Sequence, residues 1–273
     1  MSQPSREAHE AEQEEKAKEE GVPEGEVIYR SVRQDGEHAL GLSSGALIWS
    51  GLAAGLSMGF CLIAKGLLIV HLPHAGWTPL VSSFGYTAGF LIVILGRQQL
   101  FTEQTLTAVL PLLARNRTLG SLSNVARLWA IVLVANIVGT AIIAGTTALT
   151  PAFSQEAHAA FLEIGQKTMS HDLATTFMRG IYAGYLIAVM VWLLPGAAAA
   201  RLWIVVLLTY FVGLGELSHV IAGSSDCLYL VFKGERTVVE YVTAFLLPAL
   251  AGNAVGGVIF VAALAHWQHA PDE

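Results

Sequence analysis

Charged residues are scarce in this chain. Asp, Glu, Lys and Arg together make up 13% of its 273 residues, whereas a soluble domain carries about 25%. Hydrophobic residues reach 54%. This balance excludes an ordinary water-soluble domain and predicts an integral membrane protein embedded in a lipid bilayer.

Cysteine is almost absent, and so are the motifs of catalysis. Cys61 and Cys227 lie inside apolar stretches, where a thiol packs as a small hydrophobic group, so neither a disulfide nor a cysteine-bound metal is expected. The other metal candidates are histidine pairs that lack further ligands: His71/His74 and His266/His269. The chain has no ATP-binding Walker loop, no Asn-Pro-Ala turn of the aquaporin type and no recognisable protease nucleophile. We therefore expect a protein that is not an enzyme and that needs no metal, cofactor or nucleic acid.

A cleavable signal sequence is lacking too. Residues 1–40 instead hold 11 acidic and 5 basic residues, and their balance of −6 equals the net charge of the whole chain. Such a composition has too little apolar surface to fold alone, so we expect a disordered cytoplasmic tail, or at most a frayed helix. The expected domains are this acidic tail (residues 1–40), a transmembrane domain (41–268) and a short C-terminal tail (269–273).

Long apolar runs make up the rest of the chain. They cover approximately residues 45–70, 80–114, 123–149, 174–194, 202–232 and 238–266. A transmembrane helix needs about 20 residues, so the second and fifth runs are too long for one straight helix. Polar sequence interrupts both, as GRQQLFTEQT (96–105) and GLGELSHVIAGSSD (213–226). Backbone leaves a helix at membrane depth only where protein or a cavity surrounds it, so two broken helices predict an internal cavity.

A constant offset of 117 residues relates the two interruptions. The offset pairs Gly96 with Gly213, Leu100 with Leu217, Thr102 with His219, Asn136 with Asn253 and Gly139 with Gly256. With three helices in each repeat, the second copy enters the membrane in the opposite orientation. We therefore predict an all-α membrane protein of six transmembrane helices, built as two inverted three-helix repeats with helices 2 and 5 broken.

His219 is the strongest candidate for a functional residue because it lies far from the segment ends, inside the second interruption. Its imidazole and the Thr102 hydroxyl are predicted to face each other at the centre of a pathway, where an ionisable group is usually functional. The alternative is a structural histidine that caps the broken helix. Glu103 and Glu216 flank these residues, and we expect them to pair with Arg97 or to cap the restarted half-helices.

Two asparagines are expected to support the interruptions. Asn136 and Asn253 each precede a glycine by three positions, in the third and sixth segments. We expect their amides to hydrogen-bond the loops of the broken helices while the glycines allow close helix approach.

Basic residues predict the orientation in the membrane. With the acidic tail in the cytoplasm, six arginines lie at the inner ends of the segments: Arg30, Arg33, Arg115, Arg117, Arg127 and Arg201. Four basic residues lie at the outer ends: Lys167, Arg179, Lys233 and Arg236. The positive-inside rule therefore favours cytoplasmic termini.

Over residues 45–268 these features resemble the formate/nitrite transporter family. The motifs that carry the resemblance are Leu100-Phe101-Thr102 in the broken second helix, His219 to Ala222 in the broken fifth, and Gly252 to Gly257 in the sixth. The resemblance implies an aquaporin-like homopentamer in a bacterial inner membrane. It implies one pathway per protomer for small monovalent anions such as formate, nitrite, acetate or hydrosulfide, often with a proton. It also implies hydrophobic constrictions beside the central pair, from Leu100, Phe90 and Tyr86 with Phe211 or Val212 from the second repeat. Phe101 is then a further pore residue, and Lys167 attracts anions to a vestibule.

The chain departs from the family around His219. The family has an acidic residue where this chain has Ser218, and it has asparagines where this chain has Gly184 and Gly223. Two polar residues are candidates to replace the lost groups: Tyr185 and Glu216.

The functional hypothesis follows from the cost of burying charge. A bare anion in a low-dielectric constriction loses its hydration at a large cost, whereas the protonated acid crosses as a neutral molecule. We therefore expect His219 to supply or relay a proton to the substrate. Two alternatives stay open: a pH-independent channel for a small neutral solute or gas, in which His219 is only structural, and a non-transporting scaffold whose acidic tail binds a partner.

Overall fold

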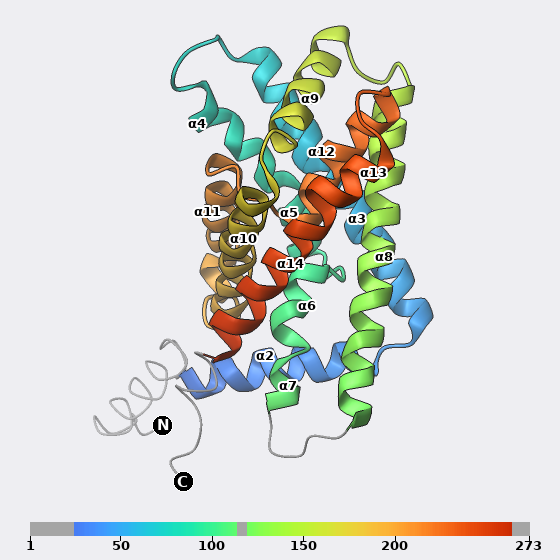
Figure 1. The fold of residues 1–273 in the computed structure, drawn as a ribbon. Coiled ribbons are helices and arrows are strands. Elements are labelled where there is room, and N and C mark those ends of the chain that lie inside the picture. The colour runs from blue at the N-terminus through green and yellow to red at the C-terminus, as the bar shows by residue number, and fades with distance from the viewer. Residues whose placement is uncertain (1–24, 114–118, 264–273) are drawn as a thin grey trace, which may run out of the picture.

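The computed structural model describes residues 25–113 and 119–263, and every regular element in these ranges is a helix. Figure 1 shows a bundle with α2 (Gly25–Gly41) across one end and α9 (Gln155–Thr168) at the other. We name these ends the α2 side and the α9 side. Several residues with predicted roles lie outside the described ranges: Arg115, Arg117, His266, His269 and the tail residues 1–24 and 269–273.

The first repeat crosses the bundle three times. Its first helix runs from the α2 side to the α9 side, its second returns in broken form, and its third crosses again (Figure 1). In chain order its elements are α3 (Ser44–His71), α4 (Thr78–Ser82), η1 (Ser83–Tyr86), α5 (Thr87–Leu95), α6 (Phe101–Thr107), α7 (Leu110–Leu113) and α8 (Leu119–Leu149).

The second repeat makes the same three crossings in the opposite directions (Figure 1). Its elements are α10 (Leu173–Leu193), η2 (Ala198–Ala200), α11 (Arg201–Leu214), α12 (Val220–Lys233), α13 (Val238–Glu240), η3 (Tyr241–Leu246), α14 (Leu247–Val255) and η4 (Gly256–Ala262). Within the described residues, 5 helices are long and apolar enough to span a membrane, and α11 with α12 makes the broken sixth span. The predicted all-α fold of two inverted repeats is confirmed.

Glycines let the first and third helices of each repeat approach closely. A β-carbon at Gly55 would overlap the carbonyl oxygen of Asn136, so α3 and α8 pack through small residues. Gly184 has the same relation to Asn253, between α10 and α14. Helix packing therefore requires glycine at position 184, where the family resemblance implies an asparagine.

At the breaks the two repeats are offset by 119 residues, not by 117. The residue with positive φ that follows each half-helix is Arg97 (φ 50°) in the first repeat and Glu216 (φ 51°) in the second. The N-cap residues of the restarted helices are Leu100 and His219. The 117-residue offset is correct for the asparagines of the third helices. Thr102 and His219 therefore do not occupy equivalent positions in the two repeats, and that part of the prediction is wrong.

The helices at the two ends of the bundle differ from the sequence expectation. Residues 25–40 belong to α2 and not to a disordered tail, because Val32, Gly36 and Ala39 form a buried face. A β-carbon at Gly36 would overlap the backbone oxygen of Thr107, so α2 lies directly on α6. Helix α9 was not predicted because it is too polar to span a membrane, yet Phe161 anchors it in the core.

Candidate functional site

Two buried polar side chains meet where the broken helices approach each other. Thr102 lies in the first turn of α6, and His219 is the N-cap residue of α12. Thr102 Oγ1 and His219 Nε2 are 2.8 Å apart, and both residues are 0% exposed. The structure thus brings together the two residues that the sequence places at the centre of the site.

The backbone decides which nitrogen of His219 carries a proton. The N–H of Ala222 donates a hydrogen bond to His219 Nδ1 at 3.1 Å. Because a backbone N–H can only donate, Nδ1 accepts, and the neutral ring carries its proton on Nε2. Nε2–H then donates to Thr102 Oγ1, which leaves the Thr102 hydroxyl proton for a third group. A doubly protonated ring would point its Nδ1–H at the N–H of Ala222, and two donors cannot hydrogen-bond each other.

One asparagine in each repeat ties a broken helix to its neighbours. Asn136 Oδ1 accepts from one backbone N–H at 2.9 Å, and its Nδ2 donates to two carbonyl oxygens at 2.8 and 2.9 Å. Asn253 makes the corresponding three bonds at 2.8, 2.9 and 2.7 Å. The partners are Phe101, Gly51 and Gln99 for Asn136, and Val220, Gly180 and Ser218 for Asn253. Both side chains therefore hold the loops of the breaks, as predicted.

A chain of aromatic rings starts at the buried pair. The ring of Phe90 meets the ring of His219 edge-on with 4.9 Å between centroids, and Tyr86 lies 5.6 Å from Phe90. Leu100 and Val212 are also fully buried. Four of the residues predicted to form constrictions thus lie in the interior of the protomer.

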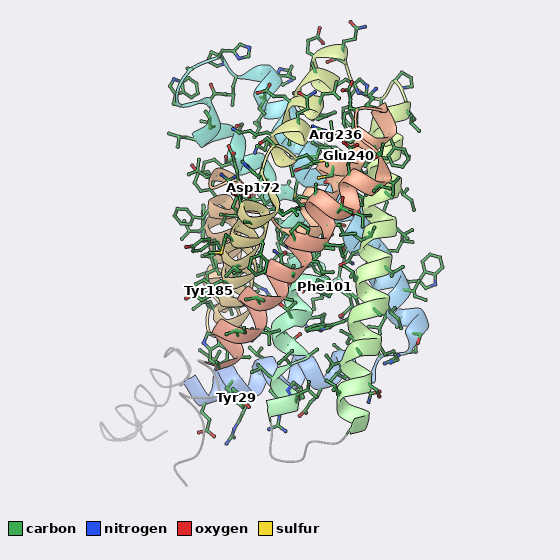
Figure 2. The ribbon with its side chains drawn as sticks, in the orientation of Figure 1. Tyr29, Phe101, Asp172, Tyr185, Arg236 and Glu240 are labelled. Carbon is green, nitrogen blue, oxygen red and sulfur yellow. The ribbon has the colours of Figure 1, made fainter. Side chains whose placement is uncertain are left out.

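Two other residues predicted for the pathway have different surroundings. The ring of Phe101, the first residue of α6, packs edge-on against Trp129 of α8 with 5.7 Å between centroids (Figure 2). Phe211 is 48% exposed on the surface of α11. Of the alternatives Phe211 and Val212, it is Val212 that faces inward, because neighbouring helical residues point about 100° apart, so the assignment of Phe211 is wrong.

A cavity of about 480 Å³ adjoins this chain of rings, and we call it the vestibule. Residues of α9, including Lys167, form part of its wall. Its innermost wall consists of buried residues from both repeats: Tyr86, Val212, Ser218, Gly223 and Phe245. The vestibule therefore reaches the immediate neighbours of His219, while Thr102 and His219 themselves stay sealed in the protein.

Charged groups of opposite sign lie together at the vestibule. Lys167 Nζ is 2.5 Å from Glu216 Oε1, and Arg179 donates to the backbone carbonyl of Glu216 at 3.1 Å. Arg179 also donates to His171 Nε2 at 2.8 Å. Burial, and then the charge of Arg179, lower the pKa of His171. Glu216 therefore neutralises Lys167 and does not play the predicted role of a partner for Arg97.

Sequence reasoning does not identify many residues of the vestibule wall, among them Lys65, Asp226 and Phe245. Asp226 is only 6% exposed, and its Oδ2 accepts a hydrogen bond from Thr168 at 3.1 Å. A signal for Asp226 exists in the sequence, because it is a carboxylate inside an apolar segment, and such groups are usually functional. No comparable signal marks Phe245, since it is one apolar residue among many.

Glu103 and Tyr185 lie closer to the α2 side than the vestibule does. Glu103 is in the first turn of α6, where a carboxylate is favourable near the positive end of the helix dipole, and Arg201 attracts it. Tyr185 packs against a buried cluster that includes Val32 and Ala188, and Figure 2 shows it on α10 toward the α2 side. Among the described residues, no group of three or more His, Cys, Asp or Glu side chains is arranged to hold a metal ion.

The chain is similar in sequence to members of one membrane protein family. The formate/nitrite transporter family model matches residues 26–267. Inner membrane protein YfdC of Escherichia coli K12 is 43% identical over 242 residues, which cover 89% of this chain and 78% of that protein. A probable formate transporter of Methanothermobacter thermautotrophicus is 26% identical over 212 residues, which cover 71% of this chain and 76% of that one.

Two solved structures share the fold. A pentameric formate channel with formate bound aligns with a TM-score of 0.71 at 20% identity, covering 82% of this chain and 96% of that one. An FNT family ion channel aligns with a TM-score of 0.72 at 20% identity, covering 89% and 99%. The predicted aquaporin-like architecture is therefore confirmed at the level of the fold.

Proposed function

Because the chain belongs to the formate/nitrite transporter family, we propose that it carries small monovalent anions, or their weak acids, between its two broken helices. Formate, nitrite and acetate are the substrates to test first. Membership in this family makes the chain a transporter and not an enzyme. The observation that carries the proposal is the fully buried contact between Thr102 Oγ1 and His219 Nε2. Polar and ionisable groups at this depth are costly and usually serve transport.

In this proposal the central pair acts through neutral hydrogen bonds. The sequence predicts that His219 supplies or relays a proton, but its Nδ1 already accepts from the backbone N–H of Ala222. A relay through the ring needs both nitrogens, and a ring that supplies a proton would first be doubly protonated, with its Nδ1–H against that N–H. We therefore assign His219 a different role. Its Nε2–H orients the Thr102 hydroxyl, whose own proton is offered to an oxygen atom of the passing substrate.

The assembly and orientation follow the relatives and the basic residues. The solved formate channel is a pentamer, and its likeness supports a homopentamer with one pathway in each protomer. Inner membrane protein YfdC supports a location in a bacterial inner membrane. Arg127 and Arg201 lie at the α2 end of α8 and α11, so the positive-inside rule supports a cytoplasmic α2 side. The vestibule then opens to the outside.

Flux into proteoliposomes of the full chain tests the proposal. An inward gradient of formate or nitrite should drive uptake that protein-free vesicles lack. Thr102→Val should lower this flux about 10-fold, the equivalent of one buried hydrogen bond. Thr140→Val is the matched control, because Thr140 is also 0% exposed but donates to the carbonyl of Ile137 in its own helix. Equal flux in both variants would remove the pair from the pathway, and absence of flux for every weak acid would reject the function.

A second candidate is a pH-independent channel for a small neutral solute or gas. The neutral state of His219 favours it, because no group of the central pair then has to change its charge. The two functions differ in their response to pH. Flux of a weak acid rises as the pH falls, whereas flux of a neutral solute responds neither to pH nor to membrane potential.

A further inference from the structure

One face of α12 connects the vestibule to the buried pair. His219, Gly223 and Asp226 are spaced by four and three positions, which places them on one face of the helix. Seven residues span about 10 Å along a helix axis. Gly223 and Asp226 both line the vestibule, and Asp226 is a buried carboxylate. A titratable group therefore lies two turns from His219, in the wall of the vestibule.

Asp226 is surrounded by groups from several elements. Thr168 of α9 donates to its Oδ2 at 3.1 Å, and Lys65 of α3 attracts it electrostatically. Among the described residues, the other titratable groups around the vestibule are Cys61 of α3, His74 before α4, Tyr86 of η1, Glu163 and Lys167 of α9, His171 after α9, Glu216 in the break, Cys227 of α12 and Tyr241 of η3. Because Lys167 is paired with Glu216 at 2.5 Å, Lys65 is the lysine of the described vestibule wall that remains for Asp226 and for an entering anion.

An apolar barrier, formed by the ring of Phe245 packed on Gly223, lies on the α12 face between Asp226 and His219. A β-carbon at Gly223 would overlap the ring of Phe245, so this ring fills the space that a side chain at position 223 would take. Phe245 is 1% exposed and belongs to the π-helical η3, which Tyr241 joins to Ser224 of α12 by a 2.8 Å hydrogen bond. An anion that entered this barrier would lose its hydration without gaining a counter-charge. The substrate must therefore become neutral on the vestibule side.

We propose that Lys65 and Asp226 form a proton-loading site, in which Lys65 binds the anion of a small weak acid and Asp226 protonates it before the Phe245 barrier. This inference rests on the proposed function. Two carboxylates in one site hold a single proton between them, so the bound anion itself draws a proton to the site. Thr168 fixes the orientation of the Asp226 carboxyl group for the transfer.

The transfer balances in protons and charge. The O–H bond of the Asp226 carboxylic acid breaks as an O–H bond forms on the substrate oxygen, which leaves an Asp226 carboxylate and a neutral acid. The neutral acid then crosses the barrier to Thr102 and His219. The Asp226 carboxylate takes the next proton from water in the vestibule, so each anion crosses together with one proton.

Asp226→Asn tests the site in proteoliposomes of the full chain with a formate gradient. Loss of a positioned proton donor should lower formate flux about 100-fold near pH 7, and the loss should shrink toward about pH 5 because the bulk then supplies neutral acid. Electrostatics alone predicts that Asp226→Asn raises the flux, since loss of a negative charge from the vestibule wall favours the binding of an anion. Glu163→Gln is the matched control, because it removes an exposed negative charge from the same vestibule wall and should leave flux unchanged or raise it.

Two further readouts separate the site from the function as a whole. Lys65→Gln should raise the half-saturating formate concentration while keeping the pH dependence, and it serves as the second variant if Asp226→Asn does not yield folded protein. Suppose that the wild type transports formate. If Asp226→Asn then has the same flux as the wild type, or a loss of flux that does not vary with pH, the proton-loading site alone is overturned. An unchanged half-saturating concentration in Lys65→Gln does the same. Wild-type vesicles that transport no weak acid overturn the proposed function.

Discussion

Asn253→Ala should lower the free energy of unfolding by about 2–5 kcal/mol. The side chain is 0% exposed and accepts one hydrogen bond from Val220 while it donates two, to Gly180 and Ser218. Hydrogen bonds inside membrane proteins contribute about 0.6 kcal/mol on average and at most about 1.7 kcal/mol, so three of them account for the range. Alanine supplies none of them and leaves the break in the fifth segment without its anchor.

Asn136→Ala should cost nearly the same, because Asn136 makes the corresponding three bonds in the first repeat. Reversible unfolding in detergent mixed with increasing dodecyl sulfate, followed by tryptophan fluorescence, measures both free energies. Thr146→Ala is the control, since this exposed hydroxyl only bonds carbonyls of its own helix and a surface change stays within about 0.5 kcal/mol. The reasoning is refuted if either asparagine variant is as stable as the control, or if the two differ by more than about 2 kcal/mol.

Three further predictions concern single residues. Gly184→Ala should cost about 1–3 kcal/mol of stability through overlap with the helix backbone opposite, whereas Gly41→Ala, which has open space around it, should cost little in the same unfolding assay. Burial and Arg179 lower the pKa of His171 in the folded state, so its stabilising effect is complete above about pH 6.5 and is lost on acidification; the melting temperature of the wild type should therefore fall more steeply with decreasing pH than that of His171→Asn. Nitrogen NMR of histidine-labelled protein should show His219 neutral with its proton on Nε2 near pH 6, and a doubly protonated ring would contradict the assignment.

The breaks were predictable because lipid cannot satisfy the polar groups that interrupt a long apolar segment, so such groups indicate backbone that is buried in protein. The offset between the repeats was less predictable. It is 119 residues at the breaks but 117 residues at the asparagines of the third helices, and the sequence does not show this two-residue gap. Thr102 and His219 do lie 117 residues apart and do touch, but one follows a helix start and the other is an N-cap. Their contact arises from the meeting of α6 with α12 and not from equivalence in the repeat.

The remaining errors have a common cause, because the hydropathy of a residue does not show which way its side chain points. Helices α2 and α9 are polar overall, and only the tertiary structure shows that Val32 and Phe161 are buried against the bundle. Phe211 and Val212 are equally apolar in sequence, yet the first is 48% exposed and the second is 0% exposed. An unaided sequence also cannot reveal that Phe245 turns toward Gly223, because a π-helical segment shifts the phase of the sixth helix.

The departures from the family pattern share one electrostatic consequence. Gly184 admits the backbone of Asn253 and Gly223 admits the ring of Phe245, so neither position has room for the asparagine that the family resemblance implies. Among the described residues, the imidazole of His219 has two hydrogen-bond partners, the Ala222 amide and the Thr102 hydroxyl, and a neutral ring satisfies both. If the centre of the pathway carries no change of charge, protonation of the substrate has to occur where a carboxylate and a cation remain in contact with water. In the described part of the chain, Asp226 meets that requirement on the same helix face as His219.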